Sequence, residues 1–485
     1  MFKLKTPIVA LVAAGLLSLP LLASAQTPAD LLKELQALKT KVEQLEKQLN
    51  EQAAAQQAQA AKQQAQAAAA VDPAEFNRVR VKAEAIEDNL EVQNLKGFKI
   101  SGVIDPTFIV NRAQKTSGIN FLNNFTGDGT NKDVFAYDNS FFGTAVLDFQ
   151  KELDGGTQFR LTLAPHKSTG SGWNVGSIVH EASVSVPIDG LKTRLIAGQL
   201  PDWSGYEYYF ANQTKLITHN MMFDFLAPNF YQGVGFDITV DKWQTKALIG
   251  NMNKVSGTLT PGKSDPILSY RVDYSKGEFQ GFGFAGQHGK FYGKRFDNFE
   301  IDTNFTRGPL TMQGQVAAAR LKNGAANGDS YALGLSALGA YKLTPRFEVI
   351  ARLDYIKNQR NGGGLLGQTA GTCKLNARND SGAFFLDKDG INNELAEVAC
   401  NDGRNGFGPG MQFVDDGAGS AQWEPTGKGV NRSALAVGFN YLFNANTTFK
   451  GEYRLDRASA PAFLYTDGNY RKNNSVLGLG VVVSF

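Results

Sequence analysis

The sequence NNSVLGLGVVVSF, residues 473–485, alternates between two kinds of side chain and decides how the rest of the chain is interpreted. A β-strand places successive side chains on opposite faces. One face of this strand is large and apolar: Phe485, Val483, Val481, Leu479 and Leu477. The other face is small or mixed: Ser484, Val482, Gly480, Gly478 and Val476. The pattern predicts either a soluble antiparallel strand or one that faces a membrane.

The composition argues against several classes of protein. The chain has 485 residues, and no run of about eighteen apolar residues follows residue 25, so a helical membrane protein is excluded. A formal net charge of +3 gives no indication of nucleic-acid binding. Fifty-two Gly and 33 Phe indicate many turns and aromatic-rich strands, whereas four His and two Cys provide little for a metal or catalytic centre. We expect no enzyme activity, no metal site and no cofactor.

Residues 1–25 have the pattern of a secretory signal peptide. A lysine-containing start precedes an apolar stretch at 8–22, and Ala23-Ser24-Ala25 provides a small-residue cleavage site. An uncleaved anchor is the alternative, but the apolar stretch is short and Pro20 interrupts it.

Residues 26–95 are predicted to form helices. Apolar residues recur at alternating spacings of four and three: Leu31, Leu35, Leu38, Val42, Leu45 and Leu49. This heptad pattern favours a coiled coil that self-associates, because a lone helix would leave the apolar seam in water. Residues 51–70 are mainly Ala and Gln, and Asp72-Pro73 is expected to start a second helix.

From Phe98 onward the hydrophobic period changes to two, which predicts an all-β domain over residues 96–485. We predict about sixteen antiparallel strands, mostly of membrane-spanning length. They lie near 98–110, 138–150, 156–164, 179–187, 191–199, 233–241, 243–250, 267–275, 278–288, 298–306, 309–320, 331–342, 346–357, 433–443, 447–457 and 474–485. Short turns alternate with longer connections, the longest near 111–137, 200–232, 358–432 and 458–473.

Outward-facing aromatic residues are expected at the short-turn ends of these strands: Phe98, Phe149, Tyr274, Phe305, Tyr341, Phe347, Phe443, Phe449 and Phe485. With the even strand number and the alternation of turns and loops, this arrangement resembles a bacterial outer-membrane β-barrel. The resemblance implies that Phe485 is an assembly signal that the barrel assembly machinery reads.

Taken whole, the chain resembles a general or phosphate-selective-like outer-membrane porin with an amino-terminal periplasmic coiled coil. The resemblance implies a homotrimer in outer-membrane lipid that lets small hydrophilic solutes or ions diffuse passively through a water-filled barrel. The alternative is a structural anchor with a closed barrel, whose periplasmic segment contacts peptidoglycan.

Charged residues of both signs are predicted on the inner face of the barrel. The basic residues are Arg160, Arg194, Lys246, Arg271, Arg352, Lys450 and Arg454, and the acidic residues are Asp148, Asp237, Asp273, Glu300, Asp302, Glu348, Asp354, Glu452 and Asp456. Because a dry interior would impose a large desolvation cost, these charges favour a wet pore lining. For any single residue, a salt bridge that braces the wall is the favoured alternative.

The third long loop, 200–232, is unusually aromatic and apolar for an exposed segment. General porins fold their third loop into the barrel, so the resemblance implies a constriction that uses Asp202, Glu207, Lys215, His219 and Asp224. The alternative is a loop that packs over the barrel mouth or on a neighbouring subunit. Both the loop and the wall lean slightly acidic in number of charges, which predicts a weak cation preference.

Cys373 and Cys400 lie in the longest loop, and an oxidising compartment favours a disulfide between them. Residues Asp387-Lys388-Asp389-Gly390 resemble part of a calcium loop, but the acidic ligand expected at the twelfth position is absent.

Overall fold

The computed structural model describes most of the chain from residue 73 onward. It covers 73–485 except 93–94, 114, 123–141, 165–177, 229, 253–265, 278–279, 292–293, 326–327, 363–408, 416, 418–420 and 466, and it also covers 39–41, 43–44, 47–48 and 51. The chain divides into two compact units, Met1–Leu95 and Lys96–Phe485. The predicted signal peptide, most of the first heptad segment, the cysteine pair and the calcium-like sequence lie outside the described residues.

The first unit contains helix α3, Pro73–Val92, which begins at a proline suited to a first helical turn. Two exposed ion pairs lie along it, Arg78 with Glu75 at 3.4 Å and Arg80 with Glu84 at 3.7 Å. Val79 is 56% exposed, so within the described residues part of the apolar pattern of this helix is uncovered. None of the helices in the described part of the chain is long and apolar enough to cross a membrane.

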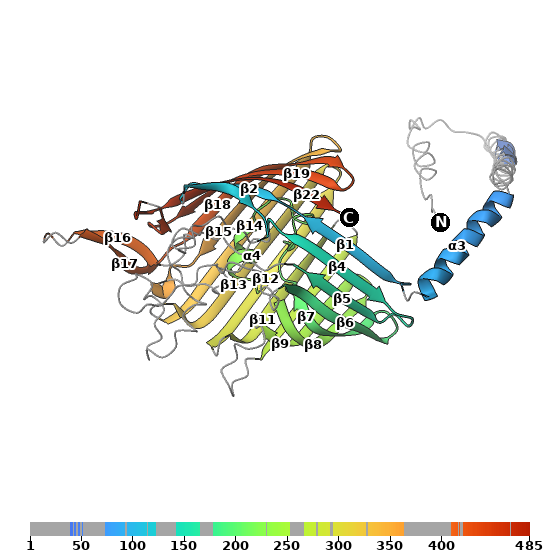
Figure 1. The fold of residues 1–485 in the computed structure, drawn as a ribbon, viewed down its shortest axis with the longest axis horizontal. Coiled ribbons are helices and arrows are strands. Elements are labelled where there is room, and N and C mark those ends of the chain that lie inside the picture. The colour runs from blue at the N-terminus through green and yellow to red at the C-terminus, as the bar shows by residue number, and fades with distance from the viewer. Residues whose placement is uncertain are drawn as a thin grey trace, which may run out of the picture. The chain divides into compact units, whose positions relative to one another are not determined.

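The second unit is a closed antiparallel β-barrel with sixteen wall positions, as predicted (Figure 1). Fourteen positions hold one strand each: β5 Gln158–Leu163, β6 Val179–Asp189, β7 Thr193–Pro201, β8 Phe230–Val240, β9 Trp243–Met252, β10 Ile267–Gly277, β11 Gln280–Phe291, β12 Lys294–Arg307, β13 Leu310–Ala325, β14 Gly328–Lys342, β15 Phe347–Lys357, β18 Arg432–Asn444, β19 Thr447–Ala458 and β22 Asn473–Ser484. Two more positions are each built from two strands. Successive strands pair antiparallel, with register shifts in some pairs, and β1 pairs with β22 to close the ring.

The two composite positions lie beside the closing seam. The first joins β1, Phe98–Ile104, to β2, Thr107–Asn111, and breaks at Asp105-Pro106, where proline cannot donate a ladder hydrogen bond. The second joins β3, Thr116–Asn120, to β4, Ala145–Glu152. The loop expected at 111–137 therefore contains a wall strand, β3. The strand expected at 138–150 is described from Ala145 and ends at Glu152.

Two small hairpins lie outside the ring, in segments predicted to be loops. One consists of β16, Pro409–Asp415, and β17, Ala421–Gly429. The other consists of β20, Phe463–Leu464, and β21, Tyr470–Arg471. A 3-10 turn, η2, Arg360–Gly362, follows β15.

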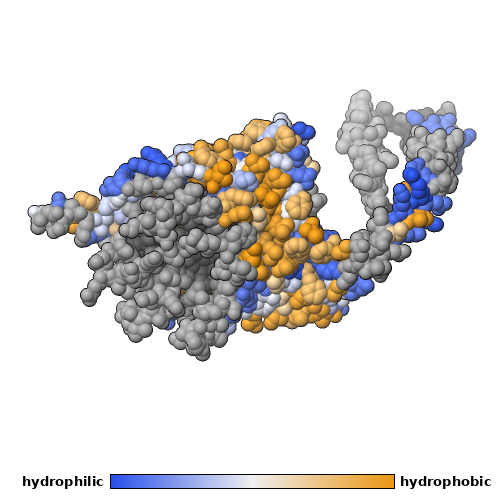
Figure 2. All heavy atoms as spheres, in the orientation of Figure 1, coloured by the Kyte–Doolittle hydropathy of each residue, from blue (hydrophilic) through white to orange (hydrophobic). Residues whose placement is uncertain are grey.

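The outer and inner faces of the barrel differ sharply in chemistry. Large apolar side chains on the outer face are exposed, including Ile249 at 63%, Ile301 at 51% and Leu333 at 51%. In Figure 2, hydrophobic residues gather over the strands and hydrophilic residues lie toward the ends of the barrel. The apolar area exposed on this outer face is far larger than soluble globular proteins tolerate.

The carboxyl-terminal residue closes the barrel by lying on the first strand. Gly102 and Phe485 exchange backbone hydrogen bonds, each with an N–O distance of 3.1 Å. The ring of Phe485 covers Gly102 so closely that a Cβ at Gly102 would lie 2.5 Å from a ring carbon. A side chain at Gly102 would therefore displace the Phe485 ring where the two ends of the sheet meet.

Replacing Gly102 with leucine should displace the Phe485 ring and destabilise the closed barrel by about 1–3 kcal/mol, the usual cost of overpacking. The measurement is the fraction of heat-modifiable folded barrel after electrophoresis without boiling. Gly339→Leu is the matched control, because a Cβ at Gly339 would meet no atom within 4 Å. Equal folded fractions for both variants would contradict this role of the seam.

Candidate functional site

The connection between β7 and β8 lies inside the barrel and packs against its inner face. We call residues 202–228 the inner loop. Its side chains are largely buried: Tyr206 is 7% exposed, Leu216 2% and Phe225 0%. This placement agrees with the inward fold that the sequence resemblance implied for the third long loop.

A carboxylate on β19 binds the middle of the inner loop. One oxygen of Glu452 accepts hydrogen bonds from the backbone N–H groups of Ile217 and Thr218, both at 2.7 Å. The other oxygen accepts from the Thr218 hydroxyl at 2.5 Å. Buried backbone donors need partners of this kind, because a loop supplies few of its own.

Two arginines bind the carbonyl groups of the same turn. Arg352 on β15 donates to the carbonyl oxygens of Thr218, at 2.6 Å, and His219, at 2.7 Å. Arg454 on β19 also donates to the carbonyl of His219, at 3.1 Å. We call Arg352, Glu452 and Arg454 the clamp, since together they satisfy donors and acceptors of one buried turn.

Lysines extend the clamp toward the short-turn end of the barrel. Lys450 donates to the carbonyl of Thr214 at 2.6 Å. Lys215 of the loop forms a 2.7 Å ion pair with Glu348 on β15, and its carbonyl accepts from Asn440 at 3.0 Å. A cavity of about 340 Å³ lies beside these residues, between the loop and the turns that end β14 and β18.

The start of the inner loop is attached to a different part of the wall. Asp202 accepts hydrogen bonds from the hydroxyl groups of Ser204 and Tyr231. Arg271 on β10 donates to the carbonyl of Gly205 at 3.3 Å. The hydroxyl of Tyr206 lies 2.6 Å from that of Ser336 on β14.

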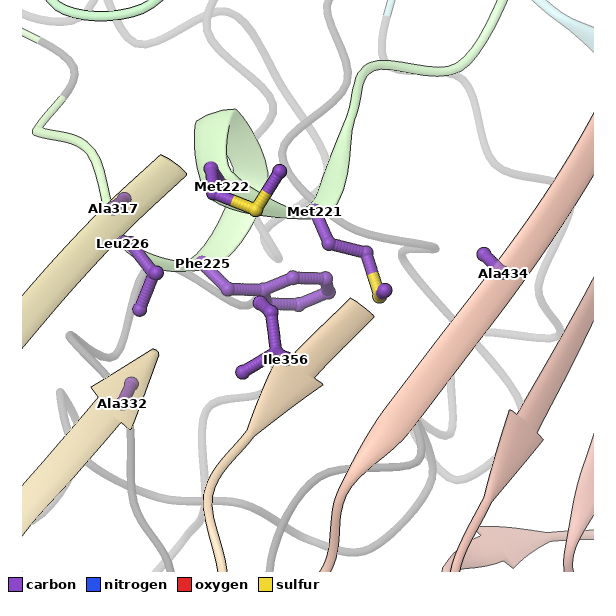
Figure 3. Packing of buried hydrophobic residues seen from close by; sticks show 8 residues of the cluster. All are labelled: Met221, Met222, Phe225, Leu226, Ala317, Ala332, Ile356 and Ala434. Atoms are coloured by element: carbon purple, nitrogen blue, oxygen red, sulfur yellow. The ribbon is translucent and has the colours of Figure 1, made fainter. Parts of the chain in front are cut away.

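The last part of the inner loop is held by apolar packing. Helix α4, Met221–Phe225, begins after Asn220, whose side chain accepts from the N–H of Phe223. Met221, Met222, Phe225 and Leu226 face small wall residues and Ile356 (Figure 3). The small residues in this cluster are Ala317, Ala332 and Ala434.

Glycines on the inner wall make room for the loop. A Cβ at Gly334 would lie 2.6 Å from the sulfur of Met222, and one at Gly438 would lie 2.6 Å from a methyl carbon of Leu216. The wall is therefore shaped to receive this loop, which a water-lined wall alone would not require.

The inner loop also touches the opposite side of the bore. The ring of His180 on β6 lies 4.6 Å from that of Tyr209 and 5.0 Å from that of Phe210. Phe210 packs with Val146 on β4 and with Ala164. The loop thus crosses the lumen from β6 to β15, where Arg352 binds it.

Part of the inner wall on β5–β9 keeps accessible charges. Arg160 bonds Asp148 at 2.9 Å and Glu181 at 3.4 Å, yet its side chain is 43% exposed. Arg194 donates to the hydroxyl of Ser185 at 2.6 Å, and Lys246 is half-buried.

The charges predicted for the inner face divide into two groups. Strand register places all of them on that face. Those that are buried are Asp148, Glu300, Asp302, Glu348, Arg352, Asp354, Lys450, Glu452, Arg454 and Asp456. Those that keep some exposure are Arg160, Arg194, Lys246, Asp237, Arg271 and Asp273. Many of the buried charges form ion pairs, as expected if salt bridges brace the wall.

The five predicted constriction residues lie in the inner loop, and four of them, Asp202, Glu207, His219 and Asp224, are nearly or fully buried. Burial raises the pKa of Asp202 to about 6, which its hydrogen bonds oppose. Burial also raises the pKa of Glu207 to about 7, although Arg352, at 3.2 Å, opposes this shift. The fifth, Lys215, is paired with Glu348.

Sequence analysis missed several residues that hold the inner loop. Arg432 pairs with Asp456 at 2.7 Å, and its guanidinium lies 5.1 Å from the ring centre of Phe225. It was assigned to a loop, one residue before the predicted strand. Gln315 and Ser336 are neutral, so a search for charged residues passed over them, although both bond the loop.

The fold and the inner loop define a class of protein: a sixteen-strand barrel whose bore is crossed by a folded loop. The chain belongs to the family described as "Protein of unknown function (DUF3138)", whose profile matches residues 4–264 and 390–485. No curated protein sequence matches the chain.

Several solved structures resemble the chain at low identity. An anion-selective porin from Comamonas acidovorans has 12% identity and a TM-score of 0.45, over 80% of this chain and 99% of that one. The outer membrane channel DcaP of Acinetobacter baumannii has 12% identity and a TM-score of 0.43, over 80% and 97%. OmpT, an outer membrane protein of Vibrio cholerae, has 12% identity and a TM-score of 0.44, over 80% and 97%.

Replacing Glu452 with alanine should loosen the inner loop, because the variant loses three hydrogen bonds and leaves the buried N–H groups of Ile217 and Thr218 without their acceptor. We expect a local cost of about 3–5 kcal/mol, as for other broken buried charge clusters. Amide hydrogen exchange should become faster at residues 214–219, and Asp237→Ala, on a wall segment away from these contacts, should leave it unchanged. Unaltered exchange in Glu452→Ala would show that the clamp does not hold the loop.

Proposed function

We propose that the protein is an outer-membrane channel for small hydrophilic solutes or ions, and that the inner loop restricts its bore. The observation that carries this proposal is the contrast between the two faces: an apolar exterior and an inner wall on which charges such as Arg160 and Lys246 stay accessible beside a buried loop.

The height of the apolar exterior supports a membrane location. On β12 the outward residues Phe299, Ile301 and Phe305 lie between two charged ones, Asp297 and Arg307. These charged residues are ten positions apart, or about 33 Å along the strand at about 3.3 Å per residue. A tilt of about 40° reduces this to about 25 Å, the height of the apolar band in outer-membrane barrels.

The accessible wall charges determine the ion preference that we propose. The weak cation preference predicted from the sequence rests on a count of charged residues. That count included acidic residues that are buried in the structure, such as Asp202, Glu300 and Glu452. Of the six predicted inner-face charges that keep exposure, four are basic and two are acidic, so we expect a preference for anions.

Replacing Lys246 with glutamine should reduce the anion preference, because it removes an accessible positive charge from the lumen. The measurement is the reversal potential across a planar bilayer in a salt gradient. Asp202→Asn should leave the reversal potential unchanged, since this carboxylate is buried at the start of the inner loop. A wild-type cation preference would show that charges elsewhere dominate the pore.

Deleting residues 208–219 and joining Glu207 to Asn220 through a short Gly-Ser linker should raise single-channel conductance severalfold, because these residues cross the bore. Shortening the β16–β17 hairpin, which lies outside the ring, is the control and should leave conductance unchanged. Equal conductance for wild type and the loop deletion would mean that the loop does not limit the pore.

A closed barrel that serves as a tether is the second candidate, favoured by the contacts of the inner loop on both sides of the bore, with His180 on β6 and with Arg352 on β15. A wild-type protein that conducts no ions, together with a loop deletion that does, would establish this function instead.

The remaining parts of the proposal concern assembly. The heptads of residues 26–95 support a self-associating periplasmic segment, and we propose a homotrimer. Residues 1–25 would direct export, Cys373 and Cys400 would form a disulfide, and Phe485 would be read by the barrel assembly machinery. Peptidoglycan contact belongs to the tether alternative.

A further inference from the structure

A row of polar side chains crosses the outer face near the end of the barrel at which the inner loop leaves β7. His288 on β11, Asp297 on β12, Arg320 on β13 and Tyr331 on β14 are successive cross-strand partners. His288 and Asp297 are 3.1 Å apart. The register places these four residues at one height, above the apolar band described for β12.

A groove lies where this row meets the apolar band. Its volume is about 700 Å³, within the range of about 300–1,000 Å³ of small-molecule sites. Phe299, Ala318 and Leu333 form its apolar part, and Phe299 and Leu333 are 41% and 51% exposed. The groove opens on the outer face, so a solute in the lumen does not reach it.

The basic residues around the groove are not all neutralised. Arg320 pairs with Asp329 at 2.6 Å, and Arg295 pairs with Asp297 at 2.9 Å. Lys357 and Arg360 also line the groove, and within the described ranges neither forms an ion pair with a carboxylate. The guanidinium of Arg360 lies 4.3 Å from the ring centre of Tyr331, which fixes its position.

We propose that this groove binds an anionic, phosphate-bearing lipid of the surrounding membrane. An acyl chain would lie along Phe299 and Leu333, where burial removes apolar surface from water. The phosphate would bind Lys357 and Arg360, since a guanidinium matches phosphate oxygens in a bidentate geometry. The charge of the rim selects an anionic headgroup over a zwitterionic one. This inference rests on the proposed membrane location but not on conductance.

The test is lipid binding to the full-length folded protein in neutral detergent, followed by native mass spectrometry and by the shift in unfolding temperature. Lipid A is the probe. Wild type should retain lipid A and unfold at a higher temperature with it. The double variant Lys357→Ser/Arg360→Ser should bind about tenfold more weakly or worse. Ala318→Phe, which fills the groove, should also lose the retained lipid.

The matched control is Lys342→Ser/Arg346→Ser, which removes two exposed basic residues at the opposite end of the barrel and should bind like wild type. Heat-modifiable migration confirms that each variant is folded. Phosphatidylcholine should give no comparable shift. Equal binding by wild type and the Lys357/Arg360 variant, equal binding of phosphatidylcholine, or the same shift with inorganic phosphate alone would each overturn the proposal.

The outcomes separate this inference from the channel function. A wild-type protein that conducts ions but does not retain lipid A refutes the groove and leaves the channel. A protein that retains lipid A through Lys357 and Arg360 but conducts no ions refutes the channel and supports the groove.

Discussion

The inner loop depends on hydrogen bonding of its own buried backbone. A segment without regular secondary structure has N–H and C=O groups that water normally satisfies, and inside the barrel much of that water is displaced. Glu452 accepts two of these N–H groups, while Arg352 and Arg454 donate to the carbonyls beside them. Arg352 also pairs with Glu207 and Asp354, and Arg454 pairs with Asp456, so these carboxylates compensate the buried positive charges. A polar inner wall is thus a structural requirement of the loop as well as a property of a pore.

The same wall serves a second purpose where the loop does not cover it. On β5–β9, Arg160 and Lys246 keep contact with solvent, whereas the charges of β15 and β19 are enclosed. Small residues accompany the enclosed charges, such as Gly334 and Gly438 beneath Met222 and Leu216. Charge and side-chain size therefore vary together around the ring, and the loop lies where the wall is both small and polar.

Most of the fold was predictable from the sequence because a barrel strand repeats one simple rule. Alternation located β18, β19 and β22 to within a few residues, and it placed Arg352 and Glu452 on the correct face. The break at Asp105-Pro106 was not predicted, since periodicity continues across it and only the pairing of β2 with β3 reveals it.

The candidate site was predictable in location but not in arrangement. The aromatic content of residues 200–232 indicated a loop that packs against something, and charge alternation identified its partners. What periodicity cannot give is which charges meet across the bore. Asp202 and Glu207 were read as lining the pore, whereas tertiary contacts to Tyr231 and Arg352 enclose them. Contacts of this kind depend on the path of the loop, which no local pattern in the sequence encodes.

Enclosure of the clamp gives the protein two sets of charges that differ in their response to ionic strength. Mobile ions screen exposed charges over about 8 Å at physiological salt but reach enclosed pairs poorly. Concentrated salt therefore weakens the field of Arg160 and Lys246 on a passing ion and leaves the bonds of Glu452 to the loop nearly intact. The width of the bore therefore stays constant while its preference for ions of one charge weakens. Selection by size and selection by charge thus respond differently to ionic strength.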